Sequence, residues 1–254
     1  MNAYCRKVLK LFLPEALLKW YRRRKLLRLR ARNKVIDTKE VFTKIYANNE
    51  WGGEAGTFCS GSGSQPMVAQ EYCEMVKEFV IQHKVATVLD LGCGDFNVGK
   101  NIQVQGVKYV GVDIVEPLIA RNIYEYGSKN IEFSCLDIIK DELPAADLVL
   151  LRQVLQHLSN EQILKILKKL ENYPFVLVSE HYPAEGGNVI PNMDKPHGSD
   201  TRVVDNSGVY LDKPPFNVLV LSTVLDVNAC NGELDSGSGE RIKTVLLGRA
   251  TKRS

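Results

Sequence analysis

The stretch Thr87–Asp95, TVLDLGCGD, decides the fold of this chain. Its apolar run contains one carboxylate, Asp90, and enters a turn whose two glycines, Gly92 and Gly94, are two positions apart. Such a turn lets the backbone approach a ligand closely. A carboxylate about 20 residues later, here Asp113 at the end of a second apolar run, can accept hydrogen bonds from both hydroxyls of a ribose. The stretch therefore predicts a strand, a ligand-binding turn and a nucleoside-like cofactor.

The residues after the glycine turn distinguish between cofactors. A dinucleotide-binding turn has a third glycine three positions after the second and holds a pyrophosphate at a helix N-terminus. Here Asn97 takes that position, and Asp95 brings negative charge to the place of the pyrophosphate. NAD is therefore disfavoured, whereas S-adenosylmethionine, which has a cationic centre and no phosphate, fits better. A plain structural bend is the alternative, and acidic residues that recur at strand ends argue against it.

Strand-like and helical patterns alternate along the middle of the chain. After the strands at 87–91 and 108–113, short apolar runs predict strands at residues 131–137, 147–151 and 175–180. Apolar residues at helical spacing predict helices at residues 66–82, with Ser64 as the cap, and 160–170. This alternation is typical of parallel βαβ units, in which ligands bind at the carboxyl ends of the strands. Asp90, Asp113 and Asp137 all lie at or near such ends.

On these motifs the chain resembles class I S-adenosylmethionine-dependent methyltransferases over residues 37–254. VLDLGCGDF resembles the glycine motif of that family, and DLVLLRQVLQHLS resembles its segment after the fourth strand. The resemblance implies an α/β Rossmann-like class I methyltransferase fold, with a mostly parallel seven-stranded sheet and a terminal antiparallel hairpin. The strand-like residues 218–227 and 241–248 suit that hairpin. It also implies a set of cofactor-binding residues: Trp51, Asp90, Gly92, Gly94, Asp95, Asp113, Ile114, Asp137, Ile138 and Gln153.

Two further segments narrow the resemblance. FTKIYANNEWGG followed by SGSGS, and the later KPPFN, resemble bacterial members found with cell-surface polysaccharide genes. We therefore expect O-methylation of a sugar or glycan intermediate, and we expect Trp51 and residues 60–64 to form a lid, with a flexible linker as the alternative. A non-catalytic cofactor-binding scaffold or regulatory subunit is the alternative function. A small-metabolite methyltransferase is a further alternative.

Methylation of nucleic acid is disfavoured. Base-amine methyltransferases place an (N/D)PP(Y/F) segment after the fourth strand, where this chain reads LRQVL at residues 151–155. The negative charge of residues 35–254 would also repel phosphates.

The long segment from His181 to Pro215 holds the candidates for acceptor activation. It shows little helical periodicity and carries five prolines, and long aperiodic loops in compact domains are usually functional or disordered. We expect His181, Asp194 and His197 to be catalytic, with His181 first because it follows the strand at 175–180 directly. Glu180, Asp200 and Arg202 lie in the same region, and a loop with solvated charges is the alternative. His157 is expected to be structural or to contact the cofactor, and no tight carboxylate or histidine cluster requires a metal.

The N-terminal segment, residues 1–36, is basic and is predicted to be amphipathic. Twelve basic residues and one acid give residues 1–34 a charge of +11, so the remainder carries −8 of the total of +3. Interleaved Trp, Leu and basic residues are typical of a segment that lies in an anionic membrane interface. The alternatives are a helix that packs on the domain or on a second subunit of a homodimer, and nucleic-acid binding. Its apolar run is too short to span a bilayer and lacks a signal-peptide cleavage site.

Six scattered cysteines without paired spacing indicate a reducing compartment. We therefore expect the protein in the cytoplasm, at the inner face of the cytoplasmic membrane if the basic segment binds lipid.

Overall fold

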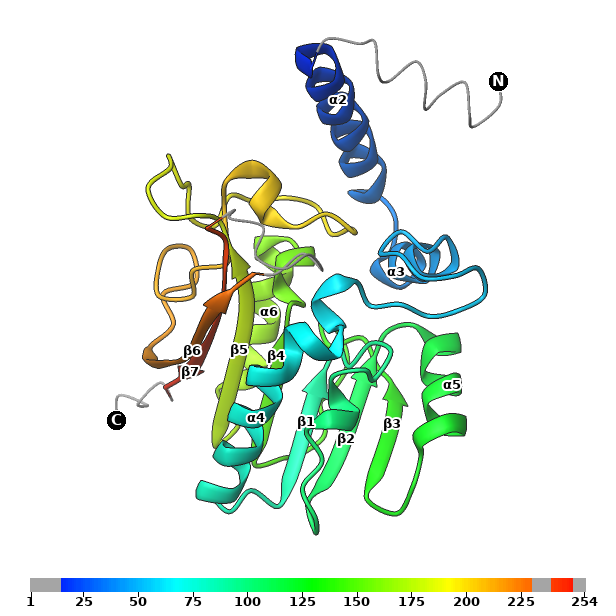
Figure 1. Ribbon diagram of the computed structural model, residues 1–254, viewed down its shortest axis with the longest axis vertical. Coiled ribbons are helices and arrows are strands. Elements are labelled where there is room, and N and C mark those ends of the chain that lie inside the picture. The colour runs from blue at the N-terminus through cyan, green and yellow to red at the C-terminus, as the bar shows by residue number, and fades with distance from the viewer. Residues whose placement is uncertain (1–14, 230–238, 249–254) are drawn as a thin grey trace.

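A computed structural model describes residues 15–229 and 239–248 of the chain (Figure 1). Its sheet has seven strands in the order β3-β2-β1-β4-β5-β7-β6. The strands are β1 (Thr87–Leu91), β2 (Lys108–Asp113), β3 (Ile131–Cys135), β4 (Leu148–Arg152), β5 (Phe175–Tyr182), β6 (Val220–Asn228) and β7 (Arg241–Leu247). Strands β1 to β5 are parallel, whereas β7 is antiparallel to β5 and pairs with β6 as a hairpin. The predicted α/β fold with a terminal antiparallel hairpin is confirmed.

The strand ends differ from the predicted ones in ways that affect the site. Strand β3 stops at Cys135, so Asp137 lies two residues beyond the strand. Strand β5 continues to Tyr182, because β7 pairs with it as far as that residue. His181 therefore lies within a strand and not in the loop that follows, which corrects the prediction.

Two helices have the predicted bounds. They are α4 (Pro66–Gln82) and α6 (Asn160–Leu170), and α6 begins with a capping box formed by Ser159 and Gln162. Ser64 does not cap α4, because its hydroxyl donates to Gly61 O and its backbone lies in the short 3₁₀ turn η1 (Ser62–Ser64). The sequence reading missed α5 (Glu116–Tyr126), which follows β2. The other elements are α3 (Thr38–Ala47), η2 (Gly99–Asn101), η3 (Leu155–His157) and η4 (Arg202–Asp205).

Apolar layers cover both faces of the sheet. Side chains of α4, such as Val76 and Val80, pack with Leu148 and Leu150 on one face. Side chains of α6 pack with Leu89 and Leu91 on the other. Because β1 and β4 are buried on both faces, their sequences are mostly apolar, with Asp90 as the interior exception in β1. This burial holds the carboxyl ends of the parallel strands at one edge, where the site is built.

Helix α2 (Glu15–Asn33) projects from the side of the domain where the parallel strands end (Figure 1). Its last turns contact the segment after β5. Arg30 forms ion pairs with Asp200 and Asp205, and Asn33 Nδ2 donates to His197 O at 3.2 Å. The helix accounts for part of the predicted segment 1–36, and residues 1–14 lie outside the described residues. Among the described helices, none is long and apolar enough to cross a membrane.

Candidate functional site

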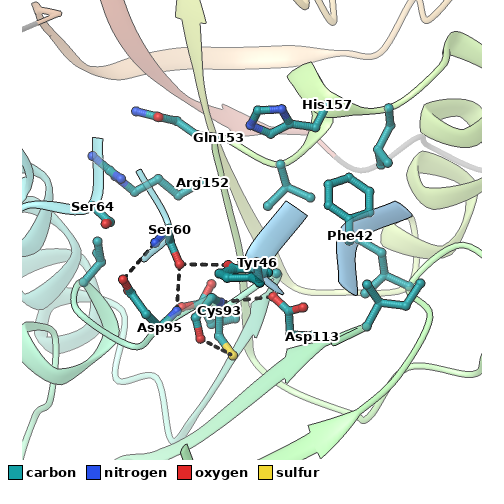
Figure 2. A pocket seen from close by; sticks show the side chains of 18 of the residues that line it. Phe42, Tyr46, Ser60, Ser64, Cys93, Asp95, Asp113, Arg152, Gln153 and His157 are labelled. Carbon is teal, nitrogen blue, oxygen red and sulfur yellow. Dashed lines mark hydrogen bonds between the residues drawn. The ribbon is translucent and has the colours of Figure 1, made fainter. Parts of the chain in front are cut away.

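A cavity lies at the carboxyl ends of β1, β2 and β4 (Figure 2). Asp95 and Asp113 lie on one side of it, and Gln153 and His157 lie on the opposite side (Figure 2). All ten residues predicted to bind the cofactor line this cavity: Trp51, Asp90, Gly92, Gly94, Asp95, Asp113, Ile114, Asp137, Ile138 and Gln153. Parallel strands end at the same edge of a sheet, so residues far apart in the sequence meet here.

The turn after β1 depends on glycine at two positions. The backbone N–H groups of Gly92 and Cys93 both donate to Val112 O, at 2.8 and 3.0 Å, which ties the turn to β2. Gly94 has a φ of +55°, and a Cβ there would lie 2.3 Å from Ser60 Oγ. A Cβ on Gly92, whose φ is +77°, would lie 2.6 Å from Val154. The backbone can therefore lie against the cavity only because these two positions lack side chains.

The carboxylate of Asp113 is held in place by backbone groups. Its Oδ2 accepts from Gly94 N–H at 3.2 Å and its Oδ1 accepts from Val115 N–H at 3.0 Å. The side chain is buried, and burial raises the pKa of Asp113 to about 6 although these hydrogen bonds act in the opposite direction. A carboxylate has about four acceptor sites, so it retains acceptor capacity toward a ligand in the cavity.

Two other acids extend this polar wall. Asp90 accepts a hydrogen bond of 2.6 Å from Tyr109 Oη, and burial raises the pKa of Asp90 to about 6. Asp137 Oδ1 accepts from Ile139 N–H at 2.9 Å, and its other oxygen lies 3.2 Å from Lys140 Nζ. These contacts fix both carboxylates at the edge of the cavity.

The segment that precedes α4, from Trp51 to Ser64, contacts the glycine turn and lines the cavity. Ser60 and Asp95 are linked twice, because Asp95 Oδ2 accepts from Ser60 N–H at 2.9 Å and Ser60 Oγ accepts from Asp95 N–H at 2.8 Å (Figure 2). Tyr46 Oη lies 2.9 Å from Ser60 Oγ, and the Tyr46 and Trp51 rings pack edge to face at a centroid distance of 5.2 Å. Trp51, Ser60 and Ser64 line the cavity, so the segment that was predicted to form a lid contacts it.

The residues that line the cavity but were not predicted from the sequence include Phe42, Tyr46 and Arg152. Phe42 and Tyr46 come from α3, where helical periodicity indicates buried residues but not what they face. Arg152 ends β4, next to the predicted Gln153, and its position at a strand end was a usable signal. Its guanidinium donates to Gly63 O at 2.8 Å and lies 5.1 Å from the ring centroid of Tyr72.

A second cavity adjoins the first and shares Trp51, Ser60, Gln153 and His157 with it. Its remaining lining is about half polar, also includes the aliphatic residues Val203, Val204, Ala229 and Ile242, and comes mainly from the segment before α4, the segment after β5 and the terminal hairpin. The polar groups include three serines, a threonine, two glutamines and two histidines: Ser60, Ser62, Ser199, Thr201, Gln153, Gln156, His157 and His181. Two connected cavities, the first with four carboxylates in its lining and the second with hydroxyl, amide and aliphatic groups, can hold two different molecules side by side.

His181 lies in the second cavity beside a carboxylate. Its Nε2 is 3.0 Å from Glu240 Oε2, and the two side chains are 14% and 24% exposed. Glu240 immediately precedes β7, whose antiparallel pairing with β5 brings the two residues together. Burial lowers the pKa of His181, and the Glu240 carboxylate partly offsets this lowering.

His157 lines both cavities and is fixed by its neighbours. Its Nδ1 lies 3.1 Å from Gly198 O, and its ring is 5.1 Å from that of Trp51. Burial lowers the pKa of His157 to about 4, so the ring is neutral at pH 7. Because a carbonyl oxygen only accepts, Nδ1 carries the proton. These contacts fix the His157 ring at the boundary between the two cavities.

The other two residues that were predicted to activate the methyl acceptor, Asp194 and His197, lie outside both cavities. Asp194 Oδ1 accepts from Asn160 N–H at 2.7 Å at the start of α6. His197 lies between Gln162 Nε2 and Ile36 O, at 3.2 and 3.1 Å. These contacts hold the segment after β5 against α6 and the residues after α2, which corrects the prediction that Asp194 and His197 face an acceptor.

Three further candidates from the same region are also structural. Glu180 is fully buried and accepts from Leu155 N–H and Gln156 N–H at the start of η3, at 2.8 and 3.1 Å. Asp200 pairs with Arg30 of α2, and Arg202 donates to Leu158 O at 2.7 Å.

Comparison with known proteins agrees with this architecture. Residues 89–173, about a third of the chain, match the family model described as a methyltransferase domain. The carboxy-S-adenosyl-L-methionine synthase of Glaesserella parasuis serovar 5 (strain SH0165) is 34% identical over 93 residues, which cover 34% of this chain and 39% of that protein. The protein of the same name from Actinobacillus pleuropneumoniae serotype 5b (strain L20) is 35% identical over 91 residues, covering 33% and 38%. The match thus spans about two fifths of the length of these relatives.

Solved structures share the fold across most of the chain. The N-methyltransferase NodS from Bradyrhizobium japonicum WM9 is 12% identical with a TM-score of 0.53, covering 84% of this chain and 100% of that one. Magnesium protoporphyrin IX methyltransferase from Synechocystis PCC 6803 is 14% identical with a TM-score of 0.52, covering 85% and 99%. At these identities the likeness concerns the fold, and this chain has the Rossmann-like methyltransferase fold.

Proposed function

We propose that this chain, a protein with the Rossmann-like methyltransferase fold, is an S-adenosylmethionine-dependent methyltransferase that acts on a sugar or glycan hydroxyl. One observation carries the proposal: a buried carboxylate, Asp113, lies beside a glycine turn in one cavity, and a second cavity with hydroxyl and amide side chains in its lining adjoins it. The two structures compared above were solved with S-adenosylhomocysteine and S-adenosylmethionine respectively. The matching methyltransferase domain model supports the same activity.

The lining of the first cavity suits S-adenosylmethionine. Four carboxylates, Asp90, Asp95, Asp113 and Asp137, line it, and among the described lining residues Arg152 is the one with a permanent positive charge. An acidic wall attracts a sulfonium and an ammonium group but repels a pyrophosphate. Asp113 would hold the ribose hydroxyls, Asp137 and Ile138 would lie at the adenine, and the glycine turn would lie at the methionine part. When bound, S-adenosylmethionine supplies a methyl group on a sulfonium whose charge is lost on transfer.

The second cavity has the chemistry of a site for a polyhydroxylated acceptor. Ser62, Ser199 and Thr201 offer hydroxyls, and Gln153 and Gln156 offer amides. These groups both donate and accept hydrogen bonds, as the hydroxyls of a sugar do. The indole of Trp51 adds an apolar surface against which the C–H face of a sugar ring can pack. These features support a sugar or glycan over a planar apolar acceptor.

His181 would act as the general base in this cavity. A sugar hydroxyl is a weak nucleophile, and a base that takes its proton as the new O–C bond forms accelerates such a reaction by about 10²–10⁴-fold. The neutral imidazole accepts the proton, and the Glu240 carboxylate at 3.0 Å stabilises the imidazolium that results. Orientation of the acceptor by the hydroxyl and amide groups would supply a further large part of the acceleration.

Transfer of a labelled methyl group tests the proposal. The protein is incubated with S-adenosylmethionine that is isotopically labelled in the methyl group and with sugar nucleotides, oligosaccharides, lipid-linked glycans, small metabolites or RNA. Mass spectrometry then identifies the product. We expect a labelled methyl ether on a carbohydrate, with Asp113→Asn strongly impaired and Glu116→Gln, an exposed carboxylate outside the cavity, unchanged.

Each other outcome identifies a different function. Tight cofactor binding without transfer to any acceptor would favour the scaffold or regulatory subunit. Label on RNA or on a small metabolite would favour those acceptor classes, and a chemically altered cofactor would favour the activity named for the two relatives. Absence of cofactor binding would contradict the whole proposal.

A further inference from the structure

Helix α2 carries apolar side chains on two opposite sides. Leu18, Leu26 and Leu29 are half-buried, and Asn33 on the same side is buried against the domain. Leu17, Trp20, Tyr21 and Leu27 lie on the opposite side at helical spacings of three, four and seven residues, and they are 45%, 54%, 59% and 50% exposed. The helix therefore has one apolar side that contacts the domain and a second apolar side that faces outward. We call Leu17, Trp20, Tyr21, Arg24, Leu27 and Arg28 the outer face.

The inner side of α2 is bound to the domain by ion pairs. Arg30 pairs with Asp200 and Asp205, and Arg23 also pairs with Asp205. The Arg30, Asp200 and Asp205 side chains are only 11%, 10% and 5% exposed. These buried ion pairs fix the orientation of α2 relative to the domain. The outer face is therefore exposed to solvent in a defined direction.

The outer face combines apolar side chains with positive charge. Arg24 and Arg28 lie within it, and the guanidinium of Arg24 is 5.1 Å from the ring centroid of Trp20. Lys25 and Arg32, which are exposed, flank it. Long basic side chains can extend their charges beyond the level of neighbouring leucine and tryptophan side chains. Such a face can insert apolar groups into a lipid interface while its cations reach the headgroups.

We propose that the outer face of α2 docks on an anionic lipid surface. Charge complementarity supports this partner, because residues 1–34 carry +11 and the remainder of the chain carries −8, so attraction to anionic lipid is confined to this end. A second copy of the chain is disfavoured, because pairing of two outer faces would bring Arg24 and Arg28 against the same residues of the partner. A nucleic acid would neutralise the arginines but would leave the exposed leucines in water. The inference does not depend on the proposed enzymatic activity.

Vesicle binding by the full chain tests this docking. Vesicles of phosphatidylglycerol and phosphatidylcholine are compared with vesicles of phosphatidylcholine alone, by co-sedimentation at rising salt. We expect binding to the anionic vesicles only, weakened by salt. Arg24→Gln with Arg28→Gln should weaken it about 30-fold, since each basic residue near such a surface contributes roughly a factor of five. Leu17→Ser with Leu27→Ser should weaken it at least about tenfold.

Matched controls separate the outer face from general charge and hydrophobicity. Lys129→Gln with Lys168→Gln removes the same charge from exposed positions outside α2, and Ile81→Ser removes an exposed apolar side chain, so both should bind like the wild type. Thermal unfolding checks that every variant is folded. Trp51→Phe leaves Trp20 as the single tryptophan, whose emission should shift to the blue and be quenched by brominated lipid chains on binding.

Three results would overturn the proposal. They are no binding to anionic vesicles, binding that the control variants weaken as much as the outer-face variants do, and Trp20 emission that lipid leaves unchanged. Self-association or RNA binding that depends on the outer face, without lipid binding, would assign the face to that partner instead. Cofactor affinity is measured on the same samples, so failure here and failure of the proposed enzymatic function are distinguishable.

Discussion

Replacement of Asp113 by asparagine gives the sharpest test of the first cavity. The carboxylate accepts one backbone hydrogen bond on each oxygen, from Gly94 and Val115, at 3.2 and 3.0 Å. About two acceptor sites remain for the two ribose hydroxyls. Asparagine has nearly the same shape but no charge and a single acceptor oxygen. Hydrogen bonds to charged groups contribute about 1.5–3 kcal/mol, so we expect the variant to bind S-adenosylmethionine about 2–3 kcal/mol more weakly, roughly 30- to 150-fold.

Isothermal titration calorimetry of the wild type, Asp113→Asn and Glu116→Gln measures this difference. Glu116 is a suitable control because its side chain is 72% exposed and its carboxylate pairs with Lys39 at the surface. Thermal unfolding establishes that the variant is folded, since the Gly94 N–H loses a carboxylate partner. An Asp113→Asn protein that is folded and binds S-adenosylmethionine with wild-type affinity would refute the assignment of the ribose partner. Wild-type protein that binds NAD and not S-adenosylmethionine would refute the choice of cofactor.

Three further predictions concern pH, catalysis and stability. Burial raises the pKa of Asp113 to about 6, and only its ionised carboxylate accepts hydrogen bonds from two hydroxyls, so the affinity for the cofactor should be about tenfold lower at pH 5 than at pH 7. Calorimetry that shows the same affinity at both pH values would contradict this reasoning. Any loss of affinity at pH 5 that remains in Asp113→Asn reports the protonation of Asp90, whose pKa is also raised to about 6. His181→Gln should lower methyl transfer by about 10²–10⁴-fold while cofactor affinity stays the same, and near-normal turnover would exclude His181 as the base. Arg30→Gln leaves the carboxylates of Asp200 and Asp205 without their shared partner, so denaturant titration should show a free energy of unfolding lower by about 3 kcal/mol. Lys44→Gln, at an exposed ion pair, should cost less than about 1 kcal/mol, and equal effects of the two changes would argue that α2 is not held by these pairs.

The sequence by itself determined ten residues that line the first cavity. Its signals are local: two glycines two apart need a backbone conformation that other residues resist, and the apolar run at 87–91 needs a strand buried on both faces. Once the strands are known to be parallel, their carboxyl ends meet at one edge. This is why residues as distant as Asp90, Asp137 and Gln153 could be assigned to a single cavity. The bounds of α4 and α6 followed in the same way from their helical periodicity.

Only the tertiary structure determined which residues line the second cavity. Glu240 reaches His181 because β7 pairs antiparallel with β5, and the register of that pairing depends on contacts between segments about 60 residues apart. Asp194 and His197 share an irregular segment with Ser199 and Thr201, yet only the latter two line the second cavity. In such a segment no period of two or 3.6 residues relates sequence position to direction, so side-chain orientation is set by packing against α2 and α6. The sequence shows the basic charge of the N-terminal segment. Which side of α2 contacts the domain and which side is the outer face could be determined only from the position of the helix against the domain.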